Sequence, residues 1–497
     1  MIRICCITVL LLCALPVRAQ TTFTVNTTDD TNDGTCNAAH CSLREAISAA
    51  NAAAGTDNIT FAIAGSGIKT IKPTSALPTI TDPVNIDGQS TPGAALVIEL
   101  DGSLAGLANG LVIMAGNSSV RDLIINRFTG AGILLSTGGS NTIAGNLIGM
   151  NAALTQAAGN RDGVYIFNSA DNIVGGISEA DRNIIAGNSD DGVNFEGPGA
   201  IGNSVQGNSL GFRNTSGSTF GNAGDGVKIS NTSSSNTIAG NSIAYNVGRG
   251  ILGEFDVSGG YGNLISTNSI FSNGALGIDL NGDGVTANDP DDLDTGANDL
   301  QNFPVLLSAS TTGAALLVEG TFNSTPDTTF MLEFFASATC DSSGSGEGER
   351  YVGSASLGTG GDGNLSFSAE LASVVTAGDW LTATATNPDN STSEFSACIP
   401  IMSADAPGVA PGINAYNTLT PTLSWTRVSW AQGYRLQVDN NADFSSPEYA
   451  NLNLPANTLE DEATLPTPGV YYWRVCAVQA NGLCGGWSAR GEFRVLG

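Results

Sequence analysis

One repeated phrase constrains the fold of this chain more than any other feature of its sequence. The pattern Asn-x-Ile-x-Gly-Asn-x-Ile runs from Asn141 to Ile148, and related copies begin at Asn183, Asn203, Asn236 and Asn263. Between Gly132 and Gly277, a glycine followed by an alternating apolar stretch returns at intervals of 31, 29, 34, 24 and 27 residues. A period of this length is typical of one turn of a solenoid.

Within each period the pattern favours strands over helices. Three short apolar stretches are separated by Gly and Asn, which tolerate the left-handed backbone needed at sharp corners, and no helical stripe lies between them. Parallel strands joined only by turns form a parallel β-helix, whose coils stack at about 4.8 Å around an apolar core. Because 26 of the residues from 101 to 300 are Asn, we expect asparagine ladders along the stack.

Composition argues against several functions. The chain has 497 residues, with 46 Asp and Glu against 18 Lys and Arg, and its net charge of −28 opposes nucleic-acid binding. Its single histidine, His40, argues against a Ser/His/Asp hydrolase and against a multi-histidine metal site. The length predicts three or four structural units.

The amino terminus predicts export. Residues 1–19 have the pattern of a secretory signal, with Arg3 before an apolar core and Val17-Arg18-Ala19 before a cut at Gln20. No later stretch has membrane length, so we expect a secreted or cell-surface protein with no membrane span in the mature chain.

Cysteine usage agrees with an oxidising compartment. Three of the nine cysteines lie in the signal, and the other six fall into local pairs. A metal site would need further clustered Cys or His ligands. We therefore predict three disulfides: Cys36–Cys41, Cys340–Cys398 and Cys476–Cys484.

A capping box follows the first of these pairs. Ser42 is placed to accept from the third helical N–H, and Glu45 to reach back to the cap N–H. An apolar stripe and a stop at Gly55 then predict a helix over about 43–54, which we expect to cover one open end of the solenoid. We interpret the neighbouring His40 as a local packing residue rather than as a ligand or base.

The sequence Cys41-Ser42-Leu43-Arg44-Glu45-Ala46, followed by Asn-x-Ile-x-Gly-Asn coils, resembles the CSLREA-domain β-helix proteins of bacteria in the pectate-lyase-like superfamily. The resemblance covers residues 20–302. It implies an all-β fold, a right-handed parallel β-helix with an amino-terminal capping helix, and an extracellular setting. It implies no catalysis, because many members have no assigned activity.

Aligning the coils brings charged residues into one corner column just before the first strand of successive turns. These are the candidate catalytic residues Asp162, Asp191, Asp225 and Arg249. A glycosidase needs two carboxylates at a defined separation, and a lyase would use Lys228 and Arg249 as charge neutraliser and base. The alternative is that these aspartates bond their own turns. The second reading is favoured because no His accompanies the carboxylates and the motifs of polygalacturonase-type relatives are missing.

Residues two positions after each coil glycine are expected to point outward from the first strand. They are Leu134, Tyr165, Asn194, Lys228, Leu252 and Asp279. By resemblance, pectate-lyase-like enzymes build a saccharide groove on this face. Tyr165, Asn194 and Lys228 are therefore the candidate binding residues.

An acidic segment follows the last coil. Oxygen-bearing side chains alternate before a glycine, as at the opening of a calcium loop, although Pro290 stands at the twelfth position where an EF-hand has a carboxylate. The sequence leaves two readings, a solvated linker and a structural calcium site. The candidate ligands are Asp279, Asn281, Asp283, Asp289 and Asp291.

The remaining sequence predicts two β-sandwich domains. Residues 303–402 alternate like the strands of an immunoglobulin-like sandwich, in which Gly346 to Glu349 is interpreted as an exposed, solvated turn. Residues 408–497 resemble a fibronectin type III domain, with aromatic residues placed for core packing rather than for a binding platform: Trp425, Tyr434 and Trp473.

Three functions remain open from the sequence. The first is a non-catalytic protein that binds extracellular polysaccharide or a surface through the β-helix. The second is a polysaccharide lyase or glycoside hydrolase acting on the same face. The third is a structural cell-surface stalk.

Overall fold

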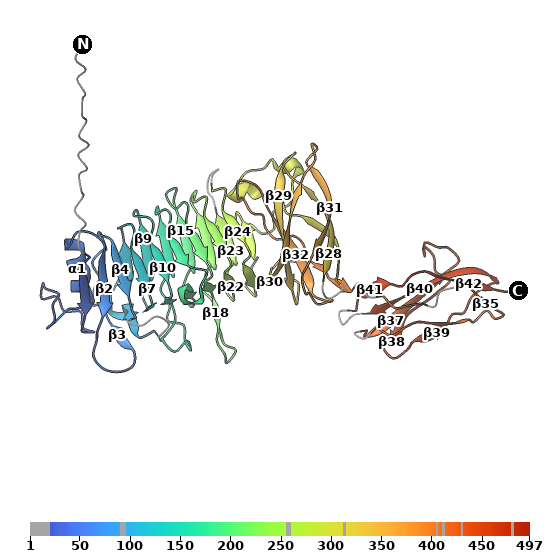
Figure 1. Cartoon of the computed structure of the whole chain (residues 1–497), viewed down its shortest axis with the longest axis horizontal. Coiled ribbons are helices and arrows are strands. Elements are labelled where there is room, and N and C mark those ends of the chain that lie inside the picture. The colour runs from blue at the N-terminus through green and yellow to red at the C-terminus, as the bar shows by residue number, and fades with distance from the viewer. Residues whose placement is uncertain are drawn as a thin grey trace, which may run out of the picture.

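The computed structural model describes residues 20–89, 96–254, 260–311, 315–403, 406–409, 413–428, 431–478 and 482–497. The expected signal, residues 1–19, lies outside these ranges. Figure 1 shows a solenoid with helix α1 at one end, a first β-sandwich at the other end, and a second sandwich beyond it. The fold is the expected one, a parallel β-helix followed by β-sandwiches.

The solenoid consists of three parallel sheets, and from β4 onward each coil contributes a strand to each sheet in turn. The first, which we call sheet A, contains β1 (Thr22–Val25), β2 (Asp57–Phe61), β4 (Val84–Asp87), β7 (Ser119–Arg121), β10 (Thr142–Ala144), β13 (Ile173–Gly175), β16 (Ser204–Gln206), β21 (Thr237–Ala239) and β24 (Leu264–Ser266). Sheet B contains β3 (Lys69–Ile71), β5 (Ile98–Asp101), β8 (Leu123–Asn126), β11 (Leu147–Ile148), β14 (Ile184–Ile185), β17 (Ser209–Leu210), β22 (Ser242–Ala244) and β25 (Ser269–Phe271). Sheet C contains β6 (Leu111–Ile113), β9 (Ile133–Ser136), β12 (Val164–Phe167), β15 (Val193–Glu196), β20 (Val227–Ser230), β23 (Ile251–Glu254) and β26 (Ile278–Leu280).

Inward Val, Ile and Leu of all three sheets form one continuous core along the solenoid. A hairpin, β18 (Phe212–Arg213) with β19 (Thr219–Phe220), leaves the solenoid after β17, and short 3-10 turns occur at Gly102–Leu104, Glu179–Asp181, Pro290–Asp292 and Ala297–Leu300. The two phenylalanines of the hairpin pack on a small apolar cluster outside the main core. The outer side of sheet B is therefore partly covered by apolar contacts.

Buried asparagines stack at the corners of the coils, as the repeat predicts. Along each ladder, the Oδ1 of an asparagine accepts two hydrogen bonds from the asparagine one coil earlier, one from its backbone N–H and one from its side-chain amide. The exception is Asn298, which accepts only from the backbone N–H of Asn263. The three ladders are Asn141–Asn172–Asn203–Asn236–Asn263–Asn298, Asn146–Asn183–Asn208–Asn241–Asn268, and Asn160–Asn188–Asn222–Asn246–Asn273. Each buried amide finds a partner in this way, so the polar corners do not disrupt the stack.

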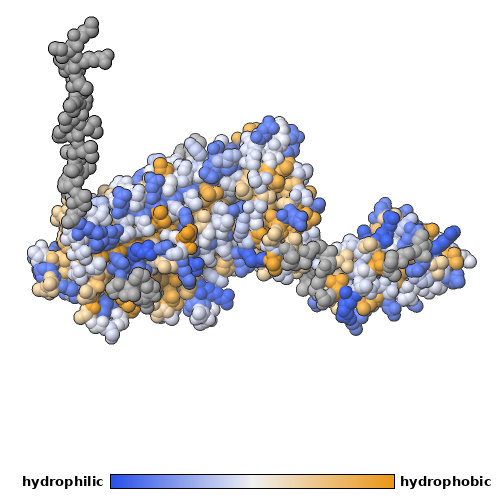
Figure 2. Space-filling model, viewed as in Figure 1, coloured by the Kyte–Doolittle hydropathy of each residue, from blue (hydrophilic) through white to orange (hydrophobic). Residues whose placement is uncertain are grey.

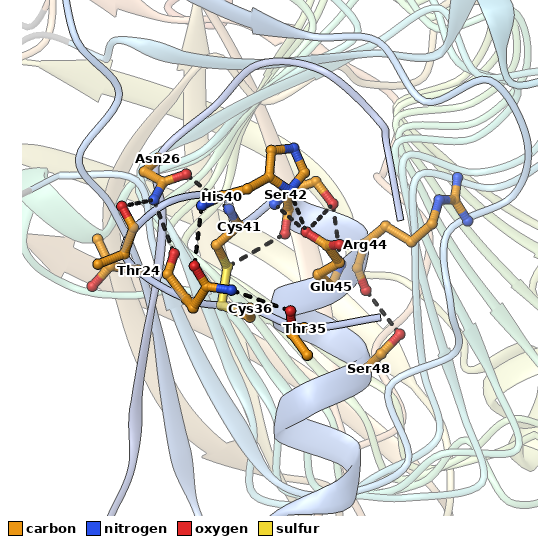
Figure 3. Close-up of a disulfide and its surroundings, with 12 residues drawn as sticks. Thr24, Asn26, Thr35, Cys36, His40, Cys41, Ser42, Arg44, Glu45 and Ser48 are labelled. Atoms are coloured by element: carbon orange, nitrogen blue, oxygen red, sulfur yellow. Dashed lines mark hydrogen bonds and ion pairs between the residues drawn. A yellow bond between two sulfur atoms is a disulfide. The ribbon is translucent and has the colours of Figure 1, made fainter. Parts of the chain in front are cut away.

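The amino-terminal cap forms as the capping box predicts. Helix α1 (Leu43–Ala52) begins after Ser42, whose hydroxyl accepts from the Glu45 N–H while the Glu45 carboxylate accepts from the Ser42 N–H at 2.9 Å. The apolar stripe of the helix is buried in the solenoid core. The Cys36–Cys41 disulfide closes the loop directly before the helix (Figure 3).

The first sandwich pairs two four-stranded sheets. One contains β27 (Val305–Thr311), β28 (Leu316–Asn323), β31 (Asn364–Leu371) and β34 (Met402–Ser403), and the other contains β29 (Thr329–Ser337), β30 (Arg350–Gly358), β32 (Trp380–Thr386) and β33 (Ile399–Pro400). The Cys340–Cys398 disulfide joins two of its loops. This sandwich also closes the last coil of the solenoid, where Phe335 and Phe395 enter the solenoid core.

Polar groups of the first sandwich satisfy the open strands of the last coil. The Thr392 hydroxyl accepts from the Ile265 N–H of sheet A, and the Gly348 carbonyl accepts from the Ile270 N–H of sheet B. In sheet C, Glu394 accepts from Leu280 N–H. All three sheets are thus terminated by the sandwich.

The turn that carries Glu347 differs from its prediction. Residues Gly346 to Gly348 are buried, not solvated, and Glu347 Oε1 accepts from the N–H and the side-chain amide of Asn273 at 3.1 and 2.8 Å. Glu347 thus takes the place of the next asparagine in the ladder that ends at Asn273. The prediction failed because the partner lies 74 positions away and comes into contact only on folding.

The second sandwich contains a sheet formed by β35 (Ile413–Tyr416), β37 (Gly433–Asp439), β38 (Tyr449–Pro455), β40 (Gly469–Val478), β41 (Cys484–Trp487) and β42 (Gly491–Val495), opposite a pair formed by β36 (Thr422–Ser424) and β39 (Glu460–Glu462). The Cys476–Cys484 disulfide links neighbouring strands. Trp425, Tyr434 and Trp473 belong to its core, as expected for packing residues.

No helix in the described ranges has the length and apolar character needed to cross a bilayer. The face of the molecule in Figure 2 intersperses hydrophilic and hydrophobic residues along the solenoid.

Candidate functional site

The outward face of sheet C is the first candidate site. The strand register places Leu134, Tyr165, Asn194, Lys228, Leu252 and Asp279 opposite one another in successive coils. The candidate binding residues Tyr165, Asn194 and Lys228 therefore form one row across three neighbouring strands, and their side chains are partly exposed.

The carboxyl-terminal end of this row is covered. Leu252 and Asp279 are only 4% and 3% exposed, although the strand pattern predicts that they point outward. Arg249 donates to the Asp279 carboxylate at 2.9 Å and to the Gly282 carbonyl at 3.0 Å, which holds the following segment over the strand ends. The accessible row therefore ends at Lys228.

Aromatic and charged groups surround Tyr165. Its hydroxyl donates to Glu196, a residue of the next coil that the sequence analysis did not single out. The Phe167 ring lies 6.0 Å from the Tyr165 ring between centroids, and the Arg161 guanidinium lies 5.6 Å from the Tyr165 centroid. Burial and the Glu196 carboxylate raise the pKa of Tyr165, so the hydroxyl stays protonated at neutral pH.

Asn194 and Lys228 continue the row. The Lys228 ammonium pairs with Glu254 at 2.6 Å. Asn194 Oδ1 is a buried atom without a hydrogen-bond partner in the described part of the chain. A buried polar atom without a partner is costly, so the hydrogen-bonding capacity of this oxygen is left unused by the described part of the chain.

The corner column caps the turns of the coils. Asp191 Oδ1 accepts from the Asp225 N–H at 2.8 Å, and Asp225 Oδ1 accepts from the Arg249 N–H at 2.6 Å. Asp162 is held by the Arg161 guanidinium at 2.6 Å. Burial raises the pKa of all three aspartates, to about 7 for Asp191.

This arrangement limits acid/base chemistry. Carboxylate oxygens of Asp162, Asp190 and Asp191 lie within 4.8 Å of one another, so the column does bring acids together. Asp162 and Asp191 are 0% and 4% exposed, however, whereas a general acid or base must come within hydrogen-bond reach of its substrate. The geometry favours turn capping over a glycosidase pair.

The acidic segment does not bring its five predicted ligands into one cluster. Asp279 is paired with Arg249, and Asn281 Oδ1 accepts from the Ala297 N–H at 3.4 Å. Asp283 is exposed, and the backbone N–H of Asp291 donates to Asn323. Of the five, only Asp289 lies in a group of close carboxylates.

That group consists of Asp289, Asp292 and Asp294, whose carboxylate oxygens lie within 4.8 Å of one another. The Oδ1 atoms of Asp289 and Asp294 are buried without a hydrogen-bond partner in the described ranges. Burial raises the pKa of Asp292 to about 6, with the neighbouring carboxylates adding to the effect. Two buried, unpartnered oxygens beside a third carboxylate fit a hard cation such as Ca²⁺.

His40 lies among the carboxylates of Asp29, Asp33 and Glu45 at the amino-terminal cap. Figure 3 shows it beside Glu45 and Ser42. Its Nε2 lies 3.1 Å from Asp29, and its Nδ1 lies 3.0 Å from the capping-box Glu45. Hydrogen bonding to Asp29 is the largest cause that raises the pKa of His40; desolvation opposes it, and attraction to Glu45 adds to the increase. The predicted local role of His40 is thus an ionic contact rather than apolar packing.

Searches of protein-family models and of curated proteins find no match to this chain. Among solved structures, similar chains include two fibronectin type III domains of chicken tenascin (14% identity, 39% of this chain and 99% of that one, TM-score 0.19). A mutant of the periplasmic alginate epimerase AlgG is also similar (17% identity, 45% of this chain and 48% of that one, TM-score 0.24). The BSP domain of a biofilm-associated protein is similar as well (16% identity, 40% of this chain and 30% of that one, TM-score 0.16). This chain thus spans less than half the length of the last two.

Proposed function

We propose that this chain is a secreted, non-catalytic protein that binds extracellular polysaccharide through the outward face of sheet C. The observation that carries the proposal is the row of Tyr165, Asn194 and Lys228, whose partly exposed side chains lie on three neighbouring strands. An extended row on a rigid sheet suits a repeating polymer, because successive sugar units can occupy successive coils. The three disulfides suit an oxidising, extracellular compartment.

The test is retention of the mature chain, beginning at Gln20, on neutral and acidic polysaccharides. We expect a Tyr165→Ala/Lys228→Ala variant to bind at least about tenfold more weakly, because it loses the aromatic surface and the cation of the row. Tyr261→Ala, which removes a tyrosine 56% exposed elsewhere on the solenoid, is the matched control and should bind like wild type. If the Tyr165→Ala/Lys228→Ala variant were retained as well as the Tyr261→Ala control, the proposal would be contradicted. If no polysaccharide retained the wild-type chain, a structural stalk would be favoured.

A polysaccharide lyase or hydrolase is the second candidate, because Asp191 has a pKa raised to about 7 within a carboxylate cluster. The same incubations are therefore assayed for released oligosaccharide. We expect none. Release that disappears in an Asp191→Asn/Asp225→Asn variant would support catalysis by the corner column, and release that persists would place the chemistry elsewhere.

We also propose that Asp289, Asp292 and Asp294 hold a structural Ca²⁺ ion. The Asp292 carboxylate accepts from the Asn302 N–H at 2.9 Å and from the Ser324 hydroxyl, so the cluster lies where the solenoid passes into the first sandwich. A bound cation would offset the repulsion among the three carboxylates and give the two unpartnered oxygens a ligand role.

Calcium is expected to raise the melting temperature of the mature chain by several degrees over an EDTA-treated sample, because binding to the folded state alone stabilises it. An Asp289→Asn/Asp294→Asn variant should lose this response. Asp283→Asn, in the same acidic segment but outside the cluster, should keep it. A melting temperature that chelation leaves unchanged would contradict the calcium site.

A further inference from the structure

A hollow of about 370 Å³ lies where the solenoid meets the first sandwich. Its walls come from three separate parts of the chain: the hairpin residue Arg213, the coil corners around Tyr245 and Phe271, and the sandwich loop 337–349. The Cys340–Cys398 disulfide anchors this loop, and Glu347 ties it to the solenoid through Asn273. The hollow therefore forms only when both domains are in contact.

Two aromatic rings form its apolar side. Tyr245 and Phe271 come from successive coils of sheet B, and their rings meet edge to face with centroids 5.5 Å apart. Both side chains are only partly buried, so ring surface remains available to a ligand. The hollow thus offers an aromatic surface of the kind that small-molecule sites use.

Tyr245 stands at a left-handed corner of its coil. Tyr245 has φ 64°, a left-handed conformation that is unfavourable for a bulky residue and favourable for glycine. At the corresponding corner two coils earlier, Gly187 precedes the ladder residue Asn188 with φ 72°. In the next coil Ser272 precedes the ladder residue Asn273 with φ 56°, so this corner accepts residues other than glycine, and Tyr245 is the one that adds an aromatic ring to the hollow.

Polar groups without protein partners complete the walls. Within the described residues, the Arg213 guanidinium and the Glu349 carboxylate have no hydrogen bond or ion pair, and the Asp341 carboxylate accepts only from the Ser343 N–H of its own turn. The hydroxyls of Ser272 and Thr339 are likewise unengaged there. One cation, three acidic residues (Asp341, Glu347 and Glu349) and free hydroxyls therefore line the same space as the aromatic rings.

We propose that this hollow binds one neutral saccharide unit. A sugar ring presents an apolar C–H face that suits the Tyr245 and Phe271 rings, and hydroxyl groups that donate to carboxylates and accept from a guanidinium. The volume suits a monosaccharide or the end of a chain. Three acidic residues against one guanidinium, on a chain of net charge −28, disfavour uronates and other anionic sugars. This site is separate from the row on sheet C and does not depend on its function.

The experiment titrates the full mature chain with neutral mono- and disaccharides and with matched uronic acids, followed by calorimetry or by saturation-transfer NMR. We expect saturable binding of at least one neutral sugar and none of its uronate. Tyr245→Gly should weaken this binding at least tenfold, and Glu349→Gln should weaken it several-fold. Tyr261→Ala and the sheet C variant Tyr165→Ala should leave it unchanged, so that failure here and failure of the proposed polysaccharide face are distinguishable.

Tyr245→Gly removes the ring while relieving the left-handed backbone, so the variant should melt close to wild type and a loss of binding would not reflect misfolding. The proposal is overturned if no neutral sugar binds, if the uronate binds as well as the neutral sugar, or if Tyr245→Gly binds as tightly as wild type.

Discussion

At the scale of single residues, the solenoid depends on pairs formed by a left-handed residue and an asparagine. Ser140, Asp171 and Ser235 have φ of 60°, 58° and 56°, and each precedes a ladder asparagine of the first column. The left-handed residue turns the chain, and the asparagine that follows directs its amide along the stack. The recurrent Gly-Asn dipeptides express the same geometry with the residue that adopts it most readily.

The ladder makes single asparagines costly to replace. Asn208→Ala removes an acceptor for the N–H and side-chain amide of Asn183 and a donor to the carbonyl of Val174, all of them buried. We expect the free energy of unfolding of the solenoid to fall by about 2–4 kcal/mol in urea titrations followed by circular dichroism. Asn231→Gly is the matched control. Asn231 is an exposed asparagine of the same coil with φ 50°, and its replacement should change stability by less than about 0.5 kcal/mol. Equal effects of the two would exclude the ladder as a source of stability.

At the scale of elements, the capping helix α1 is fixed by charge as well as by apolar burial. Glu45 is 2% exposed and accepts from the backbone N–H groups of Ser42 and Asp33 at 2.9 and 2.6 Å. His40 adds a positive charge beside this carboxylate when protonated. The capping box predicted the helix start, whereas the ionic contact depends on how the preceding loop folds back.

The cap should therefore respond to pH through His40. Because the pKa of His40 is raised from 6.5 in the folded state, its contribution to stability is fully present below about 6.5 and is lost as pH rises through the raised value. We expect His40→Gln to lower the protection of α1 amides from hydrogen exchange at pH 5.5, and to have a much smaller effect at pH 8.5. Lys69→Gln, which removes a cation that is not part of the His40 cluster, should show no such pH dependence. A His40→Gln effect of the same size at both pH values would contradict the ionic role.

At the scale of the whole molecule, the first sandwich is the carboxyl-terminal cap of the solenoid. Three glutamates of the sandwich accept from donors of the last coil: Glu333 from Ser266 and Thr267, Glu347 from Asn273, and Glu394 from Leu280 and Thr286. Burial raises the pKa of all three, to about 7 for Glu347 and Glu394. The junction is thus more than a linker, because it satisfies strand ends that would otherwise be open.

Glu347→Gln tests this junction. The pKa of Glu347 rises from 4.5 to about 7 on folding, so the wild-type protein loses stability as pH rises from about 4.5 to about 7 and then levels off. Glutamine keeps the acceptor for Asn273 without the charge. We expect the variant to be about 2 kcal/mol more stable than wild type at pH 8 and equal to it at pH 4.5, in thermal unfolding at both pH values. Glu349→Gln, two positions away and exposed, should change little. A variant that is less stable than wild type at pH 8 would contradict a cost of charge burial at this junction.

Local patterns in the chain were enough to predict the β-helix, the start of α1 at Leu43, the asparagine ladders and the three disulfides. The β-helix, the helix start and the ladders depend on residues that are close in sequence or recur in each coil, so backbone preference and burial specify them locally. The disulfides followed from pairing the six remaining cysteines in chain order, although Cys340 and Cys398 are 58 positions apart. The buried roles of Glu347 and Asp279, the cluster of Asp289 with Asp292 and Asp294, and the hollow around Tyr245 became visible only in three dimensions. The three aspartates lie close together in sequence, between positions 289 and 294, and only the burial of their oxygens depends on the tertiary structure. Glu347, Asp279 and the hollow join segments from different coils or different domains. Spacing along the chain does not encode which side chains meet there, because that is fixed by how the sandwich docks on the last coil.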